Sequence, residues 1–210
     1  MLLLALGSLI STKLFAQTTY TWNAIGGGDW GTAANWTPSR TTPATNDILQ
    51  FTDGNTYVVS GVTSQTIRQL FVNTNTNVSL RSSAAATIIS INGLTAIANL
   101  AVTAGSNLQI SSTGLNALDV RFVTTTGQLG SIAGTLTINP NGAFTNSLTT
   151  NTTTTIVTVA SGGAIVNNGG VVTSSATTLI FAAGSTYRHA MDGGTIPTVG
   201  WNAASSGVGW

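Results

Sequence analysis

The feature that most constrains this chain is a succession of short apolar or alternating runs, each bounded by Gly, Asn, Ser or Thr. Examples are TYVVSGV, TIISING, GTLTINPNGAF and TIVTVASGGAIVNNG. From Tyr20 onward no convincing 3.6-residue periodicity is visible, and the runs have the length of strands. Asn-Gly at 92–93 and Gly-Gly at 162–163 supply turn residues that tolerate positive φ. The sequence therefore predicts an all-β fold of short strands and turns.

Three glycines recur about 21 residues apart, a spacing within the range that repeat architectures use. Each precedes a short strand with a bulky apolar residue: Gly142 with Phe144, Gly163 with Ile165, and Gly184 with Tyr187. A less regular copy is AGSNLQI at 104–110. A degenerate repeat of strand and turn is typical of a β-solenoid with one coil per repeat. We expect a right-handed parallel β-helix of about seven coils over residues 51–210. A β-sandwich is the alternative, since it also has turns every 8–12 residues.

Inward and outward positions alternate along each strand, which assigns an interior to the coils. The residues expected to fill it are Val78, Leu80, Ile89, Ile91, Leu100, Val102, Leu108, Ile110, Leu136, Ile138, Ile156, Val159, Ile165, Val171, Leu179 and Phe181.

Charge is scarce in this chain, and the scarcity excludes some partners. Only 5% of the residues are charged, with six basic and five acidic groups and a net charge of +1. Such a chain offers no basic patch for a phosphate backbone, so we expect no nucleic acid partner. There is no Cys, which excludes disulfides and thiolate metal sites.

The first residues, MLLLALGSLISTKLFAQ, form an apolar run that ends in small residues. The run is typical of a signal peptide over residues 1–16, although the usual basic start is missing. It is too short and interrupted for a membrane span. We therefore expect a secreted or cell-surface protein with no membrane span in the mature chain.

Residues 17–50 precede the repeats and carry Trp22, Trp30 and Trp36. A solenoid needs capping units because its terminal coils expose unpaired backbone and an apolar cross-section. Large rings suit that task, and the glycines at 26–28 would let the chain turn sharply beneath them. We expect an N-terminal aromatic cap. The alternative is that the three tryptophans contact a glycan by stacking on sugars.

The acidic and basic residues suggest two further kinds of site. Oxygen ligands for calcium could come from Asp29, Asn35, Asn46 and Asp47, although their spacing matches no compact calcium loop. A polysaccharide lyase of β-helical fold would group acidic and basic side chains on one face, which Arg68, Arg81 and Arg121 could do if they aligned on successive coils. We expect no cofactor.

The densest polar cluster is YRHAMD, with Arg188, the only histidine His189, and Asp192. A His–Asp pair can serve acid–base chemistry, but no serine in a recognisable nucleophile turn accompanies it. A single His cannot build the usual zinc site. The sequence therefore favours a polar loop and a non-enzymatic role.

The segment TWNAIGGGDWGTAANWTP, followed by a further Pro and by Asn-Asp, resembles the opening of large secreted repeat proteins of Gram-negative bacteria. In these, a tryptophan- and glycine-rich segment leads into a β-helical passenger, among autotransporters and among cargo of the type IX secretion system. AGSTYRHAMDGGTIPTVGWNAASS (183–206) is also similar to type IX cargo. The resemblance implies a surface location and an N-terminal fragment of a longer protein.

Two functions follow from these observations. The first is a non-enzymatic structural or adhesive segment. The second is a carbohydrate-binding or lyase-like module, with cell-surface or matrix polysaccharide as the partner.

Overall fold

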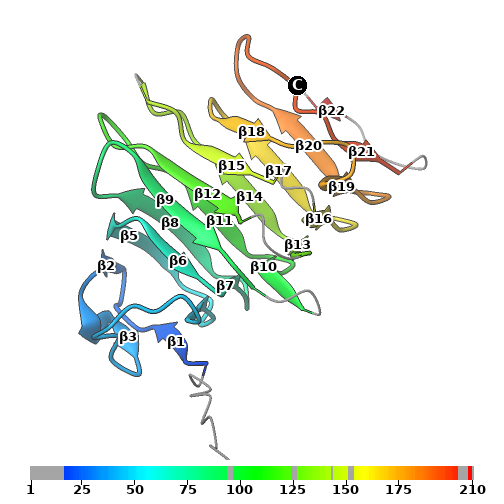
Figure 1. Ribbon diagram of the computed structural model, residues 1–210. Coiled ribbons are helices and arrows are strands. Elements are labelled where there is room, and N and C mark those ends of the chain that lie inside the picture. The colour runs from blue at the N-terminus through cyan, green and yellow to red at the C-terminus, as the bar shows by residue number, and fades with distance from the viewer. Residues whose placement is uncertain are drawn as a thin grey trace, which may run out of the picture.

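The chain winds into a β-solenoid of about five turns. The computed structural model describes residues 17–93, 97–123, 127–142, 144–150, 154–202 and 208–209. The predicted signal peptide, residues 1–16, lies outside them. Successive strands pair in parallel with the strand one coil later, and the coils stack along one axis (Figure 1). The prediction of a stacked parallel fold is confirmed, and the sandwich alternative is wrong.

Three sheets, which we name A, B and C, form the sides of the coil. Sheet A contains, in chain order, β1 (Thr19–Trp22), β3 (Trp36–Thr37), β4 (Ile48–Phe51), β7 (Gln69–Val72), β10 (Ala98–Val102), β13 (Leu129–Ile132), β16 (Ile156–Val159), β19 (Leu179–Phe181) and β21 (Gly200–Trp201). Sheet B contains β2 (Gly27–Asp29), β5 (Thr56–Val62), β8 (Asn77–Ser82), β11 (Asn107–Ile110), β14 (Thr135–Ile138), β17 (Ala164–Asn167), β20 (Thr186–His189) and β22 (Val208–Gly209). Sheet C contains β6 (Gln65–Ile67), β9 (Thr87–Ile91), β12 (Leu118–Phe122), β15 (Ser147–Thr149) and β18 (Val171–Thr173).

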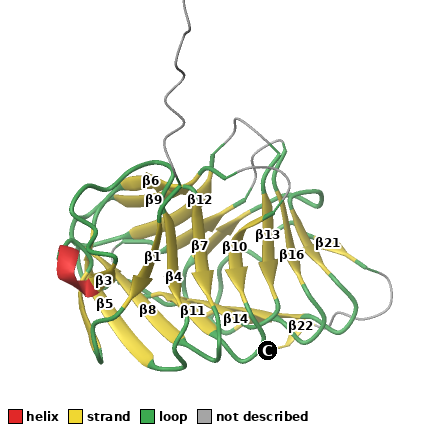
Figure 2. Cartoon of the chain, turned by 90° about the horizontal axis from the view of Figure 1, so that it is seen from below, coloured by secondary structure: helices red, strands yellow, loops and turns green. Residues whose placement is uncertain are grey.

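Strands of sheet A lie side by side from β1 to β21, and the short 3-10 helix η1 (Ala33–Asn35) lies at the β1 end (Figure 2). Each full coil visits sheets A, B and C in turn, as β7, β8 and β9 do. Because every coil repeats this path, residues far apart in sequence become neighbours in space.

The coils have unequal lengths. Leu49 pairs with Leu70 in the next coil, but Leu70 pairs with Leu100, which is much further along the chain. The pairing of Val157 with Leu179 marks a return to a short coil. The predicted spacing therefore fits some coils and fails for the longer ones, which explains why about five turns form rather than seven.

The interior is apolar along its whole length. Of the residues predicted to point inward, all but two are buried. The exceptions are Ile156 and Val171, whose exposed fractions are 42% and 46%. Each begins its strand on the outward side, because Val157 and Val172 take the inward positions that follow. An error of one residue in assigning the inward positions exchanges the two faces of a strand.

In most coils the corner from sheet A to sheet B repeats one turn, whereas only Ala133 and Gly134 link β13 to β14. Asn75, Gly105, Gly162 and Gly184 stand at the same place before equivalent strands, and all have φ between 58° and 78°. In each case the backbone N–H of the following residue donates to the carbonyl oxygen three residues before that residue, and this hydrogen bond closes the turn. A positive φ at this position suits Gly and Asn.

The register corrects two sequence interpretations. Gly142 lies after β14, on the way from sheet B to sheet C, so it does not share the role of Gly184. The predicted Gly163 also stands one position too late, because Gly162 is the glycine in register with Gly184. Phe144 lies outside the strands. The copy at 104–110, which looks irregular in sequence, is in register, because Leu108 pairs with Leu136 and Leu136 pairs with Ile165.

Candidate functional site: the N-terminal cap and the end of sheet C

The cap is an incomplete first coil that continues the solenoid. Strand β1 pairs in parallel with β4 in sheet A, and β2 pairs in parallel with β5 in sheet B. Strand β3 then turns back and pairs antiparallel with β1, so it covers the edge of sheet A. Sheet A therefore ends in an edge strand of only two residues, and such a short edge offers little backbone for another chain to pair with.

Trp22, Trp30 and Trp36 are each only 2% exposed, as a capping role requires. Trp36 meets Trp22 and Trp30 edge to face, with ring centroids 4.9 and 5.1 Å apart. The Trp36 indole N–H donates to the Trp30 carbonyl oxygen at 3.0 Å. Phe51 of the first full coil lies 5.7 Å from both Trp22 and Trp36, which joins the cap to the core. Rings buried this deeply have no face on which a sugar can stack, so the geometry favours the cap over the glycan contact.

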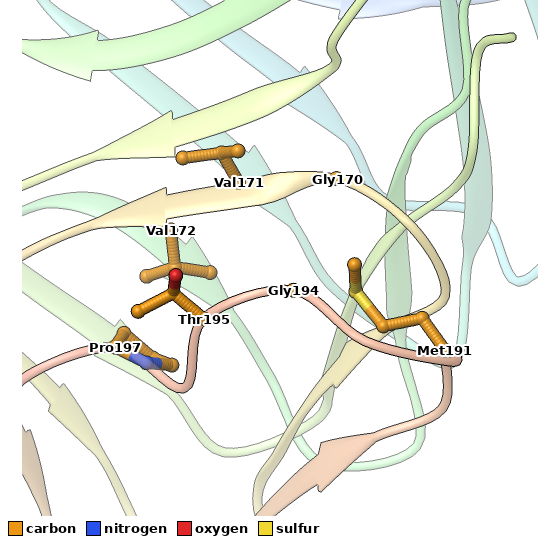
Figure 3. A pocket seen from close by; sticks show the side chains of 7 residues that line it. All are labelled: Gly170, Val171, Val172, Met191, Gly194, Thr195 and Pro197. Carbon is orange, nitrogen blue, oxygen red and sulfur yellow. The ribbon is translucent and has the colours of Figure 1, made fainter.

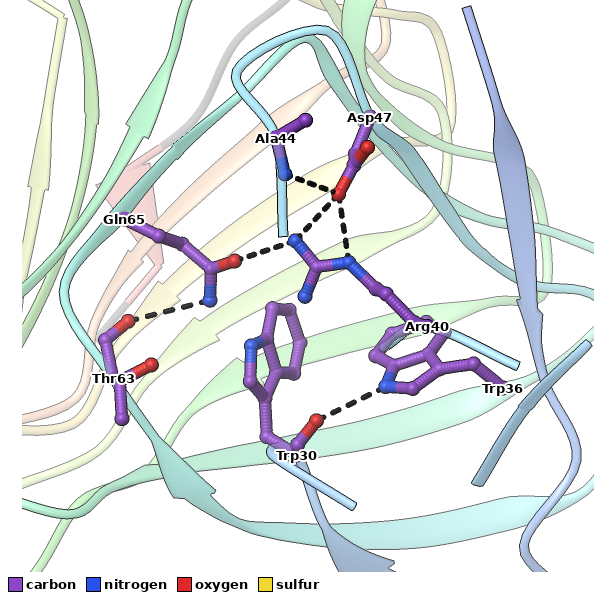
Figure 4. Close-up of polar contacts among 7 residues, drawn as sticks. All are labelled: Trp30, Trp36, Arg40, Ala44, Asp47, Thr63 and Gln65. Carbon is purple, nitrogen blue, oxygen red and sulfur yellow. Dashed lines mark hydrogen bonds and ion pairs between the residues drawn. The ribbon is translucent and has the colours of Figure 1, made fainter. Parts of the chain in front are cut away.

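A buried arginine occupies the centre of the cap, and the sequence analysis missed it (Figure 4). The Arg40 Nε donates to Asp47 Oδ2 at 2.8 Å, and its Nη2 donates to Gln65 Oε1 at 2.7 Å. The side chains of Arg40 and Asp47 are only 2% and 3% exposed. The signal for this pair was present: in so uncharged a chain, two nearby opposite charges favour a partnership, because charged groups are rarely buried alone.

The Arg40 guanidinium also faces three rings. Its carbon lies 5.7 Å from the Tyr20 ring centroid, 6.0 Å from that of Trp30 and 5.8 Å from that of Trp36. A cation over an aromatic face is attracted by the ring quadrupole, more strongly when water is excluded. The cap therefore encloses its own cation. The arrangement resembles a cage for a positively charged ligand, but Arg40 already fills it.

The oxygen ligands proposed for calcium are used in other ways. Asp47 pairs with Arg40 and also accepts from the Ala44 N–H at 3.0 Å. Asp29 accepts from the Gly31 N–H at 2.8 Å, and the Asn35 amide donates to the Asp29 backbone carbonyl. In the part of the chain that the structure describes, no three His, Cys, Asp or Glu side chains are grouped as metal ligands.

The three arginines proposed for a lyase do not align. Arg81 lies on β8 in sheet B and Arg121 on β12 in sheet C, while Arg68 lies between β6 and β7. Asp119 lies two residues before Arg121 on β12, and their ion pair measures 2.7 Å. Asp119 also accepts from Ser147 and Thr149 of the next coil, at 2.8 and 3.0 Å. This carboxylate therefore fastens two coils together.

The predicted polar cluster is divided between two faces. Arg188 and His189 alternate along β20, so Arg188 is exposed and His189 is buried. The His189 Nε2 lies 2.7 Å from the Gly193 carbonyl oxygen, and its Nδ1 lies 3.5 Å from the Tyr187 hydroxyl. Asp192 is exposed in the following loop. Instead of forming a cluster, His189 holds an interior corner, as Asn167 does one coil earlier by contacting Gly170.

Two tyrosines, Tyr57 and Tyr187, belong to one inward column of sheet B. Tyr57 donates to Asp53, and burial together with this hydrogen bond raises the Tyr57 pKa above 10.0. Burial likewise raises the pKa of Tyr187, whose hydroxyl accepts from Asn167. Both hydroxyls therefore stay protonated at neutral pH and act as structural groups.

A small pocket opens where sheet C ends (Figure 3). Its volume is about 260 Å³, and its lining residues are Gly170, Val171, Val172, Met191, Gly194, Thr195 and Pro197. Among these described residues there is no charged side chain.

Sheets A and B continue past this level to β21 and β22, but sheet C stops at β18. Val171 N donates to Asn146 O, and Thr173 O accepts from Thr150 N. The N–H and C=O of Val172 therefore face the opposite edge, toward the next segment of chain. There Pro197 is buried and brings no N–H for a further rung. The pocket is the gap that this interruption leaves.

Across the described ranges, the structure contains no helix that is long and apolar enough to cross a membrane. Comparisons with protein families, curated proteins and solved structures find no match for this chain.

Proposed function

We propose that this chain is a non-enzymatic structural or adhesive segment of a secreted or cell-surface protein. The observation that carries the proposal is the unbroken parallel ladder that runs from the cap through about five coils. A rod held by backbone pairing keeps its form without disulfides, and this chain has no Cys. The resemblance of both ends to secreted Gram-negative repeat proteins supports a surface location and a type IX or autotransporter route.

Side-chain ladders on the outer face support the same proposal. Asn139 donates to Gln109 of the coil before at 3.2 Å, and Asn168 of the coil after donates to Asn139 at 2.9 Å. Thr137 donates to Asn107 at 3.2 Å. Polar groups that bond to one another along the axis stiffen the stack, as Asn and Gln ladders do in cross-β structures.

The alternative, a carbohydrate-binding or lyase-like module, has lost its proposed aromatic platform and its proposed row of arginines. It is tested with residues 17–210 on a glycan array and in a uronate-release assay on acidic polysaccharides. We expect no release of unsaturated uronate, and an active preparation would overturn the non-enzymatic role. Binding to one glycan class, with no release, would identify the partner of an adhesive segment.

Localisation is tested separately in the source cells. An antibody against residues 17–210 and protease treatment of intact cells should find the protein outside the outer membrane. A protein that is protected in intact cells and digested only after lysis would contradict a surface role.

A further inference from the structure

The outer face of sheet B carries two exposed arginines, one toward each end of the sheet. Arg81 points outward from β8, and Arg188 points outward from β20. Four steps of the ladder separate these strands, through β11, β14 and β17 (Figure 1), so their backbones lie about 19 Å apart along the axis. In the described chain the ion pairs involve Arg40 and Arg121 instead, so neither exposed guanidinium has an acidic partner there.

Between the two arginines, outward amide and hydroxyl groups form a neutral ladder. Asn168 donates to the Asn139 Oδ1 at 2.9 Å. Asn139 in turn donates to the Gln109 Oε1 at 3.2 Å and to the Ser111 hydroxyl at 3.1 Å. At both steps the nitrogen donates toward the preceding coil. The Gln109 Nε2 ends this series and has no partner among the described residues, so its N–H groups are available to a ligand.

The free end of the ladder lies beside Arg81. Gln109 pairs with Ser79 on the neighbouring strand β8, and Arg81 is the next outward residue of that strand. Arg81 and Gln109 therefore present N–H groups from two adjacent coils to one region of the surface. Among the described strands of sheet B only the edge strand β2 carries an acid, Asp29, and that carboxylate accepts from the Gly31 N–H at 2.8 Å.

This distribution of groups favours one class of ligand. A carboxylate near Arg81 would accept charge-assisted hydrogen bonds from the guanidinium and a further bond from the Gln109 amide. The neutral ladder suits hydroxyl groups. A nucleic acid is poorly matched, because duplex DNA carries one charge per about 1.7 Å of its axis and this face offers only two cations.

We propose that the outer face of sheet B binds an acidic polysaccharide along the solenoid axis. Its carboxylates contact Arg81 and Arg188, and its hydroxyl groups contact the ladder between them. Such a polymer is the partner of the adhesive segment proposed above, and the proposal depends on that role.

The first test is isothermal titration of residues 17–210 with polygalacturonate and with its fully methyl-esterified form, which shares the backbone but lacks the carboxylates. We expect binding to polygalacturonate that weakens as salt is added, and much weaker binding to the ester. Equal binding of both polymers, or no binding of polygalacturonate at low salt, would overturn the proposal. Neither result would contradict the surface location, which is tested in intact cells. Equally tight binding of single-stranded DNA would also overturn it, in favour of non-selective attraction to polyanions.

The second test identifies the face. Arg81→Gln and Arg188→Gln should each lower the affinity for polygalacturonate about fivefold, the upper end of what an exposed ion pair contributes. Arg121→Gln is the matched control on sheet C, where Asp119 already pairs with the guanidinium, and it should leave the affinity unchanged. Wild-type affinity in both sheet B variants, or an equal loss in the control, would show that sheet B is not the binding face.

The third test concerns the end of the ladder. Gln109→Glu keeps an acceptor for Asn139 but replaces the free N–H groups with a carboxylate beside Arg81. The affinity should therefore fall at least as far as in Arg81→Gln. Circular dichroism of each variant checks that the coils stay intact, since all the substituted side chains point outward. Unchanged binding by a natively folded Gln109→Glu would contradict the proposed contact.

Discussion

The cap predicts a large and reversible loss of stability when Arg40 is replaced by Met. The substitution keeps an unbranched side chain but removes the cation, so the 3%-exposed Asp47 carboxylate loses its charged partner while the Ala44 N–H still donates to it. Breaking a buried ion pair by removing one partner costs about 3–5 kcal/mol.

The double variant Arg40→Met/Asp47→Asn is the sharper half of the experiment. It removes both charges, and the Asn oxygen can still accept from the Ala44 N–H. Replacing both partners of a buried pair is often close to neutral, so most of the loss should be recovered. The Gln65 amide, which loses the Arg40 donor in both variants, should keep the recovery incomplete.

Tryptophan fluorescence during denaturant unfolding measures this effect, because three of the five tryptophans lie in the cap. Far-ultraviolet circular dichroism follows the coils in the same samples. Solenoid stability is roughly a sum of coil and interface terms, so the fluorescence transition should move more than the dichroism transition. The reasoning is refuted if Arg40→Met costs less than about 1 kcal/mol, well below the usual cost of breaking a buried pair, or if the double variant is as unstable as the single one.

Four further changes test other parts of the molecule. Trp30→Ala should lower the unfolding free energy by about 3–5 kcal/mol in the denaturant titration. Trp30→Phe keeps a ring and removes an unpartnered buried N–H, so it should lower the unfolding free energy less; equal losses would argue against ring packing. Gly162→Ala places a side chain at a φ of 78° and should cost about 1–2 kcal/mol in thermal melts, more than Gly162→Asn, because Asn75 adopts the equivalent turn; the reverse order would contradict the shared turn. Burial raises the Asp53 pKa, but hydrogen bonds from Tyr57 and Asn55 outweigh burial and bring the pKa below 3.8. Ionised Asp53 therefore stabilises the fold above that value, and the stabilisation is lost as the pH falls through the lowered pKa. The unfolding free energy of the wild type should exceed that of Asp53→Asn by less and less from pH 5 to the acid limit, and a pH-independent difference would count against this reasoning. Pro197→Thr restores an N–H that can donate to the Val172 carbonyl oxygen, so the new amide at position 197 should be protected from hydrogen exchange; exchange at the rate of an exposed amide would show that Pro197 does not end the sheet.

The alternation of apolar residues sufficed to predict the strands, the interior and the stacking. It did so because inward positions of a solenoid demand apolar side chains on every coil, as the column from Val78 to Ile165 shows. The alternation could not predict coil length. The turn from sheet A to sheet B carries a local signal in its Gly or Asn, but the other two corners vary in length and composition, so the spacing of the three glycines was extended too far.

The cap was predicted from its tryptophans, and its polar centre was not. Arg40 and Asp47 are ordinary loop residues in sequence, and their burial depends on rings from β1, β3 and the turn after β2. The cluster of Arg188, His189 and Asp192 failed for the opposite reason. Proximity in sequence was read as proximity in space, although neighbours on a strand point to opposite faces.

The corner between sheets A and B keeps the same length in every full coil except at the shorter link from β13 to β14, and this near-constancy sets where the architecture can accept new sequence. The link from β7 to β8 has the same length as the link from β10 to β11, while the longer coils gain their additional residues along the rest of the path. Leu115, 70% exposed on one such longer connection, marks a place where a foreign epitope could be inserted and displayed without disturbing the stack. The fold thus separates the corner between sheets A and B, which keeps successive coils in register, from the longer connections, whose length and sequence can change without altering that register.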